Sequence, residues 1–125
     1  MVNAKIGDKF ENEFAEILNK LGYYAHVIAK SKTGSQPCDV FACKNNIPYM
    51  FDCKTLKNKN GLFPTHRIEE NQRLAYKKYR KCGNFSFSLA ILWENNIYLK
   101  FLHEIDFDKP SLDLKKEQIW RKYEN

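Results

Sequence analysis

Three ionisable residues, Asp39, Asp52 and Lys54, interrupt two apolar runs near the middle of the chain. The runs read as strands joined at Asn45-Asn46, because asparagine tolerates the positive φ of a two-residue hairpin turn. With this turn, paired positions sum to 91, so Asp39 lies opposite Asp52 in a non-hydrogen-bonded pair. Their Cβ atoms are then about 5 Å apart. Lys54 shares their face because side chains alternate along a strand.

Two carboxylates held this close on a half-buried sheet are destabilising unless a positive charge neutralises them. Mg²⁺ meets this need, since it prefers one or two carboxylates together with water and phosphate oxygens. A lysine beside such an ion can hold a nucleophilic water or stabilise the charge of a phosphoryl transition state. The alternative is a hairpin with two ordinary polar positions.

The elements that must position these residues begin with a helix from about Ile6 to Leu21, ended by Gly22. Its apolar stripe consists of Phe10, Phe14, Ile17, Leu18 and Leu21. Glu11 lies at one edge of the stripe. Helical geometry alone makes it a surface acid suited to the first turns of the helix.

The rest of the chain alternates between strand and helix patterns. We expect strands at 23–29, 85–93 and 97–102, with a turn at Asn95-Asn96, a helix from about Ile68 to Lys81, and a short helix at 112–120. The order α-β-β-β-α-β-β predicts an α/β fold with a mixed five-stranded sheet flanked by helices. The strand at 85–93 pairs in parallel with the hairpin through the helical crossover. Gln72 falls on the inner face of the second helix.

Composition favours a small nucleic-acid enzyme or binding domain. The 125 residues predict one domain, residues 1–125, and the net charge of +6 with a pI near 9.1 suits a polyanionic partner. Two basic loops and the segment before the second helix supply candidate phosphate contacts: Lys30, Lys32, Ser35, Lys57, Lys59 and Arg67. No apolar run reaches membrane-spanning length and no signal-peptide pattern opens the chain, so we expect a cytoplasmic protein with no membrane partner. The four cysteines lack metal-binding spacing and are read as reduced core thiols.

Four separate segments carry a family resemblance. Asp39 followed by Asp52-Cys53-Lys54 resembles the PD-(D/E)xK nuclease signature. Gly7-Asp8-Lys9-Phe10-Glu11 resembles the first-helix motif of the Holliday junction resolvases in that superfamily, of the bacterial RecU type and the archaeal type. Phe63-Pro64 and Asn71-Gln72 resemble the RecU-type segment leading into a helix that carries a glutamine. The similarity extends from about Gly7 to Phe107.

This resemblance implies a restriction-endonuclease-like core and a Mg²⁺-dependent endodeoxyribonuclease, with Mn²⁺ as a substitute. Asp39, Asp52, the backbone carbonyl of Cys53 and Glu11 would bind the metal. Lys54 would orient or activate water, and Gln72 would support that water. The resembled enzymes are homodimers that cut four-way DNA junctions and leave 5′-phosphate and 3′-hydroxyl ends.

Three alternatives remain open. The interval from Gly22 to Cys38 has only seventeen residues, shorter than the stalk of RecU-type proteins, so a nuclease for other branched, nicked or duplex DNA is the close alternative. A non-catalytic DNA-binding module would keep the basic loops while tolerating changes among the site residues. The presence of all four charged site residues favours the enzyme. A small-ligand or protein-interaction domain would leave the charge pattern without a purpose.

Overall fold

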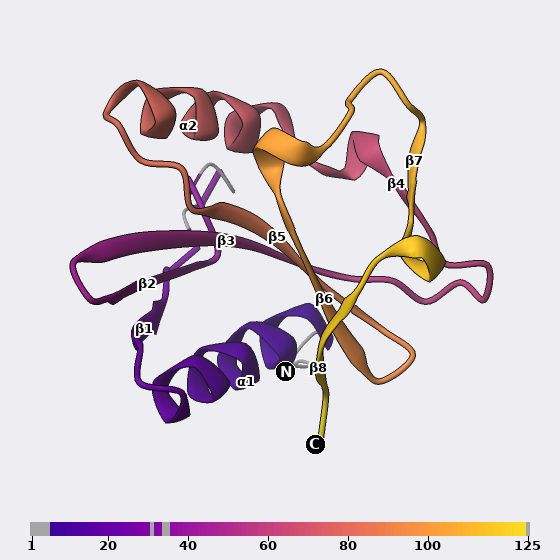
Figure 1. Ribbon diagram of the computed structural model, residues 1–125, viewed down its shortest axis with the longest axis horizontal. Helices are drawn as coiled ribbons and strands as arrows, with labels where there is room; N and C mark the ends of the chain where they lie inside the picture. The colour runs from indigo at the N-terminus through magenta and orange to yellow at the C-terminus, as the bar shows by residue number, and fades with distance from the viewer. Residues whose placement is uncertain (1–5, 31, 34–35, 125) are drawn as a thin grey trace.

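The computed structural model describes residues 6–30, 32–33 and 36–124, and its centre is a six-stranded mixed sheet. The strand order is β1-β2-β3-β5-β6-β8 (Figure 1). The strands are β1 (Tyr24–Val27), β2 (Val40–Lys44), β3 (Ile47–Thr55), β5 (Phe87–Trp93), β6 (Asn96–Phe101) and β8 (Ile119–Lys122). The predicted α/β class is confirmed, with one strand more than the sequence indicated.

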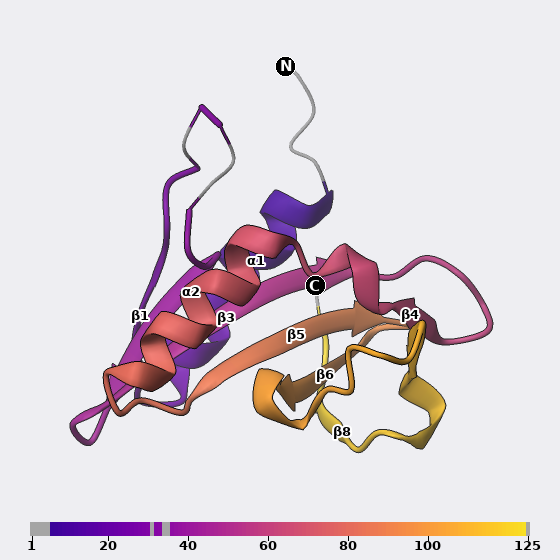
Figure 2. The same ribbon diagram turned by 90° about the horizontal axis from the view of Figure 1, so that it is seen from above.

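Two helices cover opposite faces of this sheet, as Figures 1 and 2 show. On one face, α1 (Ile6–Lys20) packs Phe10, Phe14 and Leu18 against the sheet. On the other face, α2 (Glu70–Lys81) packs Tyr76 and Tyr79 edge-on against Phe87. In the described part of the chain, no helix is long and apolar enough to cross a membrane.

The predicted hairpin register is confirmed. Strands β2 and β3 pair from Lys44↔Ile47 to Val40↔Phe51, so paired numbers sum to 91 as expected. Asn45 and Asn46 both have positive φ, 53° and 67°, which the tight turn requires. The regular ladder ends at Val40, so the predicted pairing of Asp39 with Asp52 is not part of it. Asp39 lies just outside, where its N–H donates to the carbonyl of Phe51 at 2.9 Å.

The second half joins the hairpin as predicted, through the parallel pairing of β3 with β5 across the α2 crossover. The expected turn at Asn95-Asn96 is wrong by one residue. Glu94 and Asn95 carry the positive φ angles, and Trp93 pairs with Asn96. The second helix begins at Glu70 rather than Ile68, because Thr65–Arg67 form a short 3₁₀ turn and Ile68 is extended.

The predicted helix at 112–120 is wrong. This segment forms β7 (Ser111–Asp113), a 3₁₀ turn (Leu114–Lys116) and β8. β7 pairs with β4 (Leu62–Pro64) in a small second sheet, and β8 pairs with the edge of β6. Unpaired strand edges offer hydrogen bonds that a short isolated helix cannot match, so tertiary pairing overrides the local pattern.

Candidate active site

Asp39 lies at a bend directly before β2 and is 5% exposed. Its Oδ2 accepts a hydrogen bond from the backbone N–H of Cys53 at 2.8 Å. This bond fixes the carboxylate beside the end of β3. Its backbone carbonyl accepts from the N–H of Ile28, which ties the bend to the first strand as well.

Asp52 is fully buried in the middle strand β3. No described residue makes a hydrogen bond to either of its carboxylate oxygens. The Nζ of Lys54 lies 3.3 Å from Oδ1, an ion pair without hydrogen-bond alignment. Burial raises the pKa of Asp52 to about 8; the charge of Lys54 opposes this rise, and the charge of Asp39 adds to it.

Glu11 reaches the same region from α1 and is 5% exposed. Lys30, after β1, donates a hydrogen bond to Glu11 Oε2 at 2.7 Å, and its Nζ lies 3.5 Å from Asp39 Oδ1. Burial lowers the pKa of Lys30, but the hydrogen bond to Glu11 and the charge of Asp39 outweigh it and leave that pKa raised. Lys30 was predicted to contact DNA, and its pairing with Glu11 and Asp39 was not predicted. The sequence signal for this pairing was the position of Lys30, nine residues before Asp39.

The three acids gather around Cys53. Burial raises the pKa of the Cys53 thiol, and the charges of Asp39, Asp52 and Glu11 raise it further. Burial also raises the pKa of Cys38 to about 12. Both cysteines are free, buried and held as thiols, so neither is a ready nucleophile. The structure therefore brings the predicted acids and Lys54 to one end of the central hairpin.

The donor set fits a hard divalent cation. The two buried oxygens of Asp52, which lack hydrogen bonds, and the nearby carboxylate of Asp39 are the ligand type that Mg²⁺ prefers. Among the described residues, no group of three or more His, Cys, Asp or Glu side chains is arranged to hold a metal ion. Mg²⁺ keeps several waters and can bind through one or two protein carboxylates.

Gln72 is buried at 4% exposure on α2, as predicted. Its Oε1 accepts a hydrogen bond from the backbone N–H of Glu69 at 3.1 Å, and the Glu69 side chain accepts one from the backbone of Gln72 in return. This capping box gives the side chain a structural use at the start of the helix. The neighbouring Asn71 donates to the carbonyl of Gln36 at 3.3 Å and so holds the chain leading to Asp39, a contact the sequence did not reveal.

Of the residues predicted to contact phosphate, some are exposed to solvent and one is held by contacts within the protein. Lys32, Lys57 and Lys59 are exposed. Arg67 donates to the carbonyl of Thr55 at 2.9 Å and stacks over Phe63, so it braces the end of β3. Ser35 lies outside the described residues.

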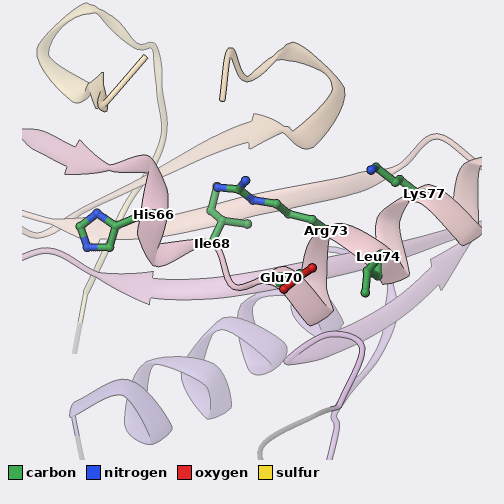
Figure 3. Close-up of a pocket in the computed structure, with 6 residues that line it drawn as sticks. All are labelled: His66, Ile68, Glu70, Arg73, Leu74 and Lys77. Atoms are coloured by element: carbon green, nitrogen blue, oxygen red, sulfur yellow. The ribbon is translucent and has the colours of Figure 1, made fainter. Parts of the chain in front are cut away.

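A separate hollow lies along the outer side of α2 (Figure 3). Its lining combines basic, acidic and apolar side chains: His66, Ile68, Glu70, Arg73, Leu74 and Lys77. Arg73 is held by the carbonyl of Thr65 and by the ring of Phe107. None of the predicted site acids lines this hollow.

Comparison with known proteins decides the family. The family model for the archaeal Holliday junction resolvase, Hjc, matches residues 2–103. The chain belongs to the archaeal Holliday junction resolvase family. Of the two resolvase types that the sequence resembles, the match confirms the archaeal type. The chain is accordingly a nuclease, a DNA-binding endonuclease of recombination and repair.

A solved structure supports the fold of this resolvase family member. Hjc from Archaeoglobus fulgidus, described as a Holliday junction resolvase from an archaeal hyperthermophile, superimposes with a TM-score of 0.63. The alignment covers 86% of this chain and 86% of that chain at 17% sequence identity. No curated protein sequence matches the chain. The family match ends at residue 103, so β7 and β8 lie beyond it.

Proposed function

We propose that this resolvase is a Mg²⁺-dependent, structure-selective endodeoxyribonuclease that cuts four-way DNA junctions by paired phosphodiester hydrolysis. The observation that carries the proposal is Asp52, whose two buried oxygens have no hydrogen-bond partner among the described residues, beside Lys54 on the same strand. The Lys54 ammonium pairs with one of these oxygens, so it compensates the buried carboxylate only in part, and a divalent cation or a proton would supply the rest.

Asp39, Asp52 and the backbone carbonyl of Cys53 would hold the ion, with Glu11 completing the site directly or through water. When bound, Mg²⁺ polarises the scissile phosphate and lowers the pKa of a water. Mn²⁺ would substitute because it accepts the same oxygen ligands.

The chain's own residues then orient the reaction. The Lys54 ammonium, 14% exposed and 3.3 Å from Asp52, would donate a hydrogen bond to the attacking water or to the negative charge that develops on the phosphate. Water oxygen forms a bond to phosphorus, the bond from phosphorus to the 3′ oxygen breaks, and that oxygen takes a proton. The products carry a 5′-phosphate and a 3′-hydroxyl. Gln72 lies on α2, and we propose that it supports the same water in addition to capping its helix.

A four-way junction contains two symmetry-related strands, so paired cutting calls for two sites related by a two-fold axis. We therefore propose a homodimer that presents one site to each strand. Exposed Lys57 and Lys59 after β3, together with Lys30 and Lys32 before β2, would hold the phosphate backbone on both sides of the site.

The decisive experiment compares wild type with Asp52→Asn on a labelled four-way junction and a matched linear duplex, each with Mg²⁺ and with EDTA. We expect paired nicks near the crossover with Mg²⁺ only, and at least a hundredfold loss in the variant, on the order expected when a transition-state charge partner is removed. Equal cutting of the junction and the duplex would show that the nuclease is not selective for junctions. Tight binding without cutting in any lane would indicate a non-catalytic DNA-binding module.

A further inference from the structure

Lys30 occupies an unusual place for a surface lysine. Its Nζ reaches into the cluster of acids and contacts Glu11 at 2.7 Å and Asp39 at 3.5 Å. The two carboxylates are nearly buried, with 7% and 6% of their side chains exposed, whereas the lysine side chain is 46% exposed. One partly exposed ammonium thus compensates two acids that water hardly reaches.

The two acids come from separate parts of the chain, nineteen and nine residues from Lys30. Glu11 approaches from α1, and Asp39 lies before β2 with its Oδ2 already bonded to Cys53. The ammonium contacts the other oxygen, Oδ1. Lys30 therefore engages the face of Asp39 that its backbone hydrogen bond leaves available to a cation.

From this geometry we infer that Lys30 is the built-in counter-cation of the metal-free site, and that a divalent ion must displace its ammonium from Glu11 and Asp39 in order to bind. This inference rests on the proposed metal-dependent function. Two cations cannot share the same carboxylate oxygens without repulsion, so the lysine and the metal compete for them. Lys30 stabilises the empty site and weakens metal binding by the same interaction.

Displacement by a metal ion would also free the Lys30 ammonium for other contacts. Because nearly half of its side chain is exposed, the displaced ammonium can swing into solvent at the mouth of the site. There it can pair with a DNA phosphate. Metal binding and the availability of this cation to DNA are thereby coupled.

The test measures metal affinity by calorimetry with Mg²⁺ and with Mn²⁺, in the absence of DNA. Lys30→Gln retains a hydrogen-bond donor but removes the charge, so we expect Kd to fall by about five- to tenfold, the size of effect one nearby charge exerts at a partly exposed site. Lys30→Arg keeps the charge and should retain the wild-type Kd. Lys32→Gln, an exposed lysine in the same loop, is the matched control for long-range charge.

Thermal unfolding gives the second readout. Lys30→Gln should lower the Tm of the metal-free protein, because two nearly buried acids lose the positive charge of Lys30, and saturating Mg²⁺ should recover most of that loss. A merely structural ion pair would leave the same Tm difference with and without metal. If the variant is unfolded without metal, recovery of the fold on adding Mg²⁺ is the supporting result, and failure to recover overturns the inference.

The outcomes separate this inference from the proposed function. If wild type binds metal while Lys30→Gln binds it equally or more weakly, then metal does not displace the Lys30 ammonium and the inference is wrong. The proposal of a metal-dependent nuclease is unaffected by that result. If wild type binds neither Mg²⁺ nor Mn²⁺, the proposed metal dependence is wrong. The inference that metal displaces Lys30 is then wrong as well.

Discussion

At the scale of single residues, Asp52 combines the deepest burial in the site with the least hydrogen bonding. Burial raises the pKa of Asp52, the charge of Lys54 on the same strand lowers it, and the charge of Asp39 at the bend raises it. Burial is the largest of these effects. A carboxyl whose pKa burial has raised takes up a proton unless a metal ion binds it. Its protonation therefore reports on the electrostatics of the site independently of any activity assay.

We predict a pH-dependent stability difference between wild type and Asp52→Asn in EDTA. The folded pKa of about 8 lies above the ordinary value of 3.8, so the folded state binds more protons between these limits. Stability contributed by the neutral carboxyl is complete below about pH 4 and is lost as pH rises through about 8. Wild type should therefore lose stability relative to the variant across this window and show no further relative change above it.

Denaturant unfolding of both proteins at several pH values from 4 to 9 measures this difference, and other titrating groups cancel in the comparison. A difference that stays constant over the window would show that Asp52 is ionised throughout. Added Mg²⁺ should flatten the curve for wild type, since metal binding favours the carboxylate.

At the scale of elements, the end of β3 depends on the loop that follows it. Trp93 donates its indole N–H to the carbonyl of Asn58 at 2.7 Å, and its ring covers Gly61. The carbonyl of Gly61 accepts from the N–H of Leu114 at 2.8 Å. The basic loop carrying Lys57 and Lys59 is therefore fastened to both the main sheet and the C-terminal segment.

We predict that Gly61→Ala is much more destabilising than Gly83→Ala. Both glycines have positive φ, +72° and +89°, and alanine in that region costs about 1–2 kcal/mol. At Gly61 the added Cβ would lie 2.8 Å from the Trp93 ring, whereas at Gly83 nothing lies within 4 Å. Gly61→Ala should therefore cost about 1–3 kcal/mol more, the range for overpacking.

Equilibrium denaturation of the two variants provides the comparison, with Gly83→Ala as the control for backbone strain alone. Equal losses would mean that the Trp93 ring moves aside without cost. A selective loss at Gly61 would confirm that this contact is tightly packed.

The C-terminal segment, which lies beyond the family match, packs against α1. Tyr123 is buried edge-on against Phe10, and its hydroxyl donates a hydrogen bond to Glu13. Trp120 meets Phe14 in a similar edge contact. These contacts hold the part of α1 that carries Glu11, so the added strand supports the site without reaching it.

At the scale of the whole molecule, the net charge of +6 is unevenly arranged. Lys57 and Lys59 follow the strand that carries Asp52. Lys116, by contrast, lines a hollow in which acids outnumber lysines: its charged residues are Lys100, Lys109, Lys116, Glu104, Asp106, Asp113 and Glu117. A DNA backbone should be drawn to the first region and not to the second.

We predict that Lys57→Gln with Lys59→Gln reduces the salt dependence of DNA binding. If each lysine neutralises one phosphate, the slope of log K against log salt should become shallower by about 2. Lys115→Gln with Lys116→Gln lowers the net charge equally but should leave the slope unchanged, because the acids around Lys116 offset the lysine charges there. Binding to a labelled junction at several salt concentrations, without metal, measures both. Equal effects of the two pairs would mean that only total charge matters.

The sequence by itself determined the hairpin of β2 and β3, because Asn45-Asn46 and alternating strand patterns are local signals that set its register. It also determined the apolar face of α1 and the parallel crossover. The added strand β8 and the small sheet of β4 and β7 were decided only by tertiary structure, since a strand edge selects its partner from distant residues. The same holds at the site. Local spacing predicted Asp39, Asp52 and Lys54 together, whereas the contact of Lys30 with Glu11 joins a helix to a loop that only the folded sheet brings within hydrogen-bonding distance.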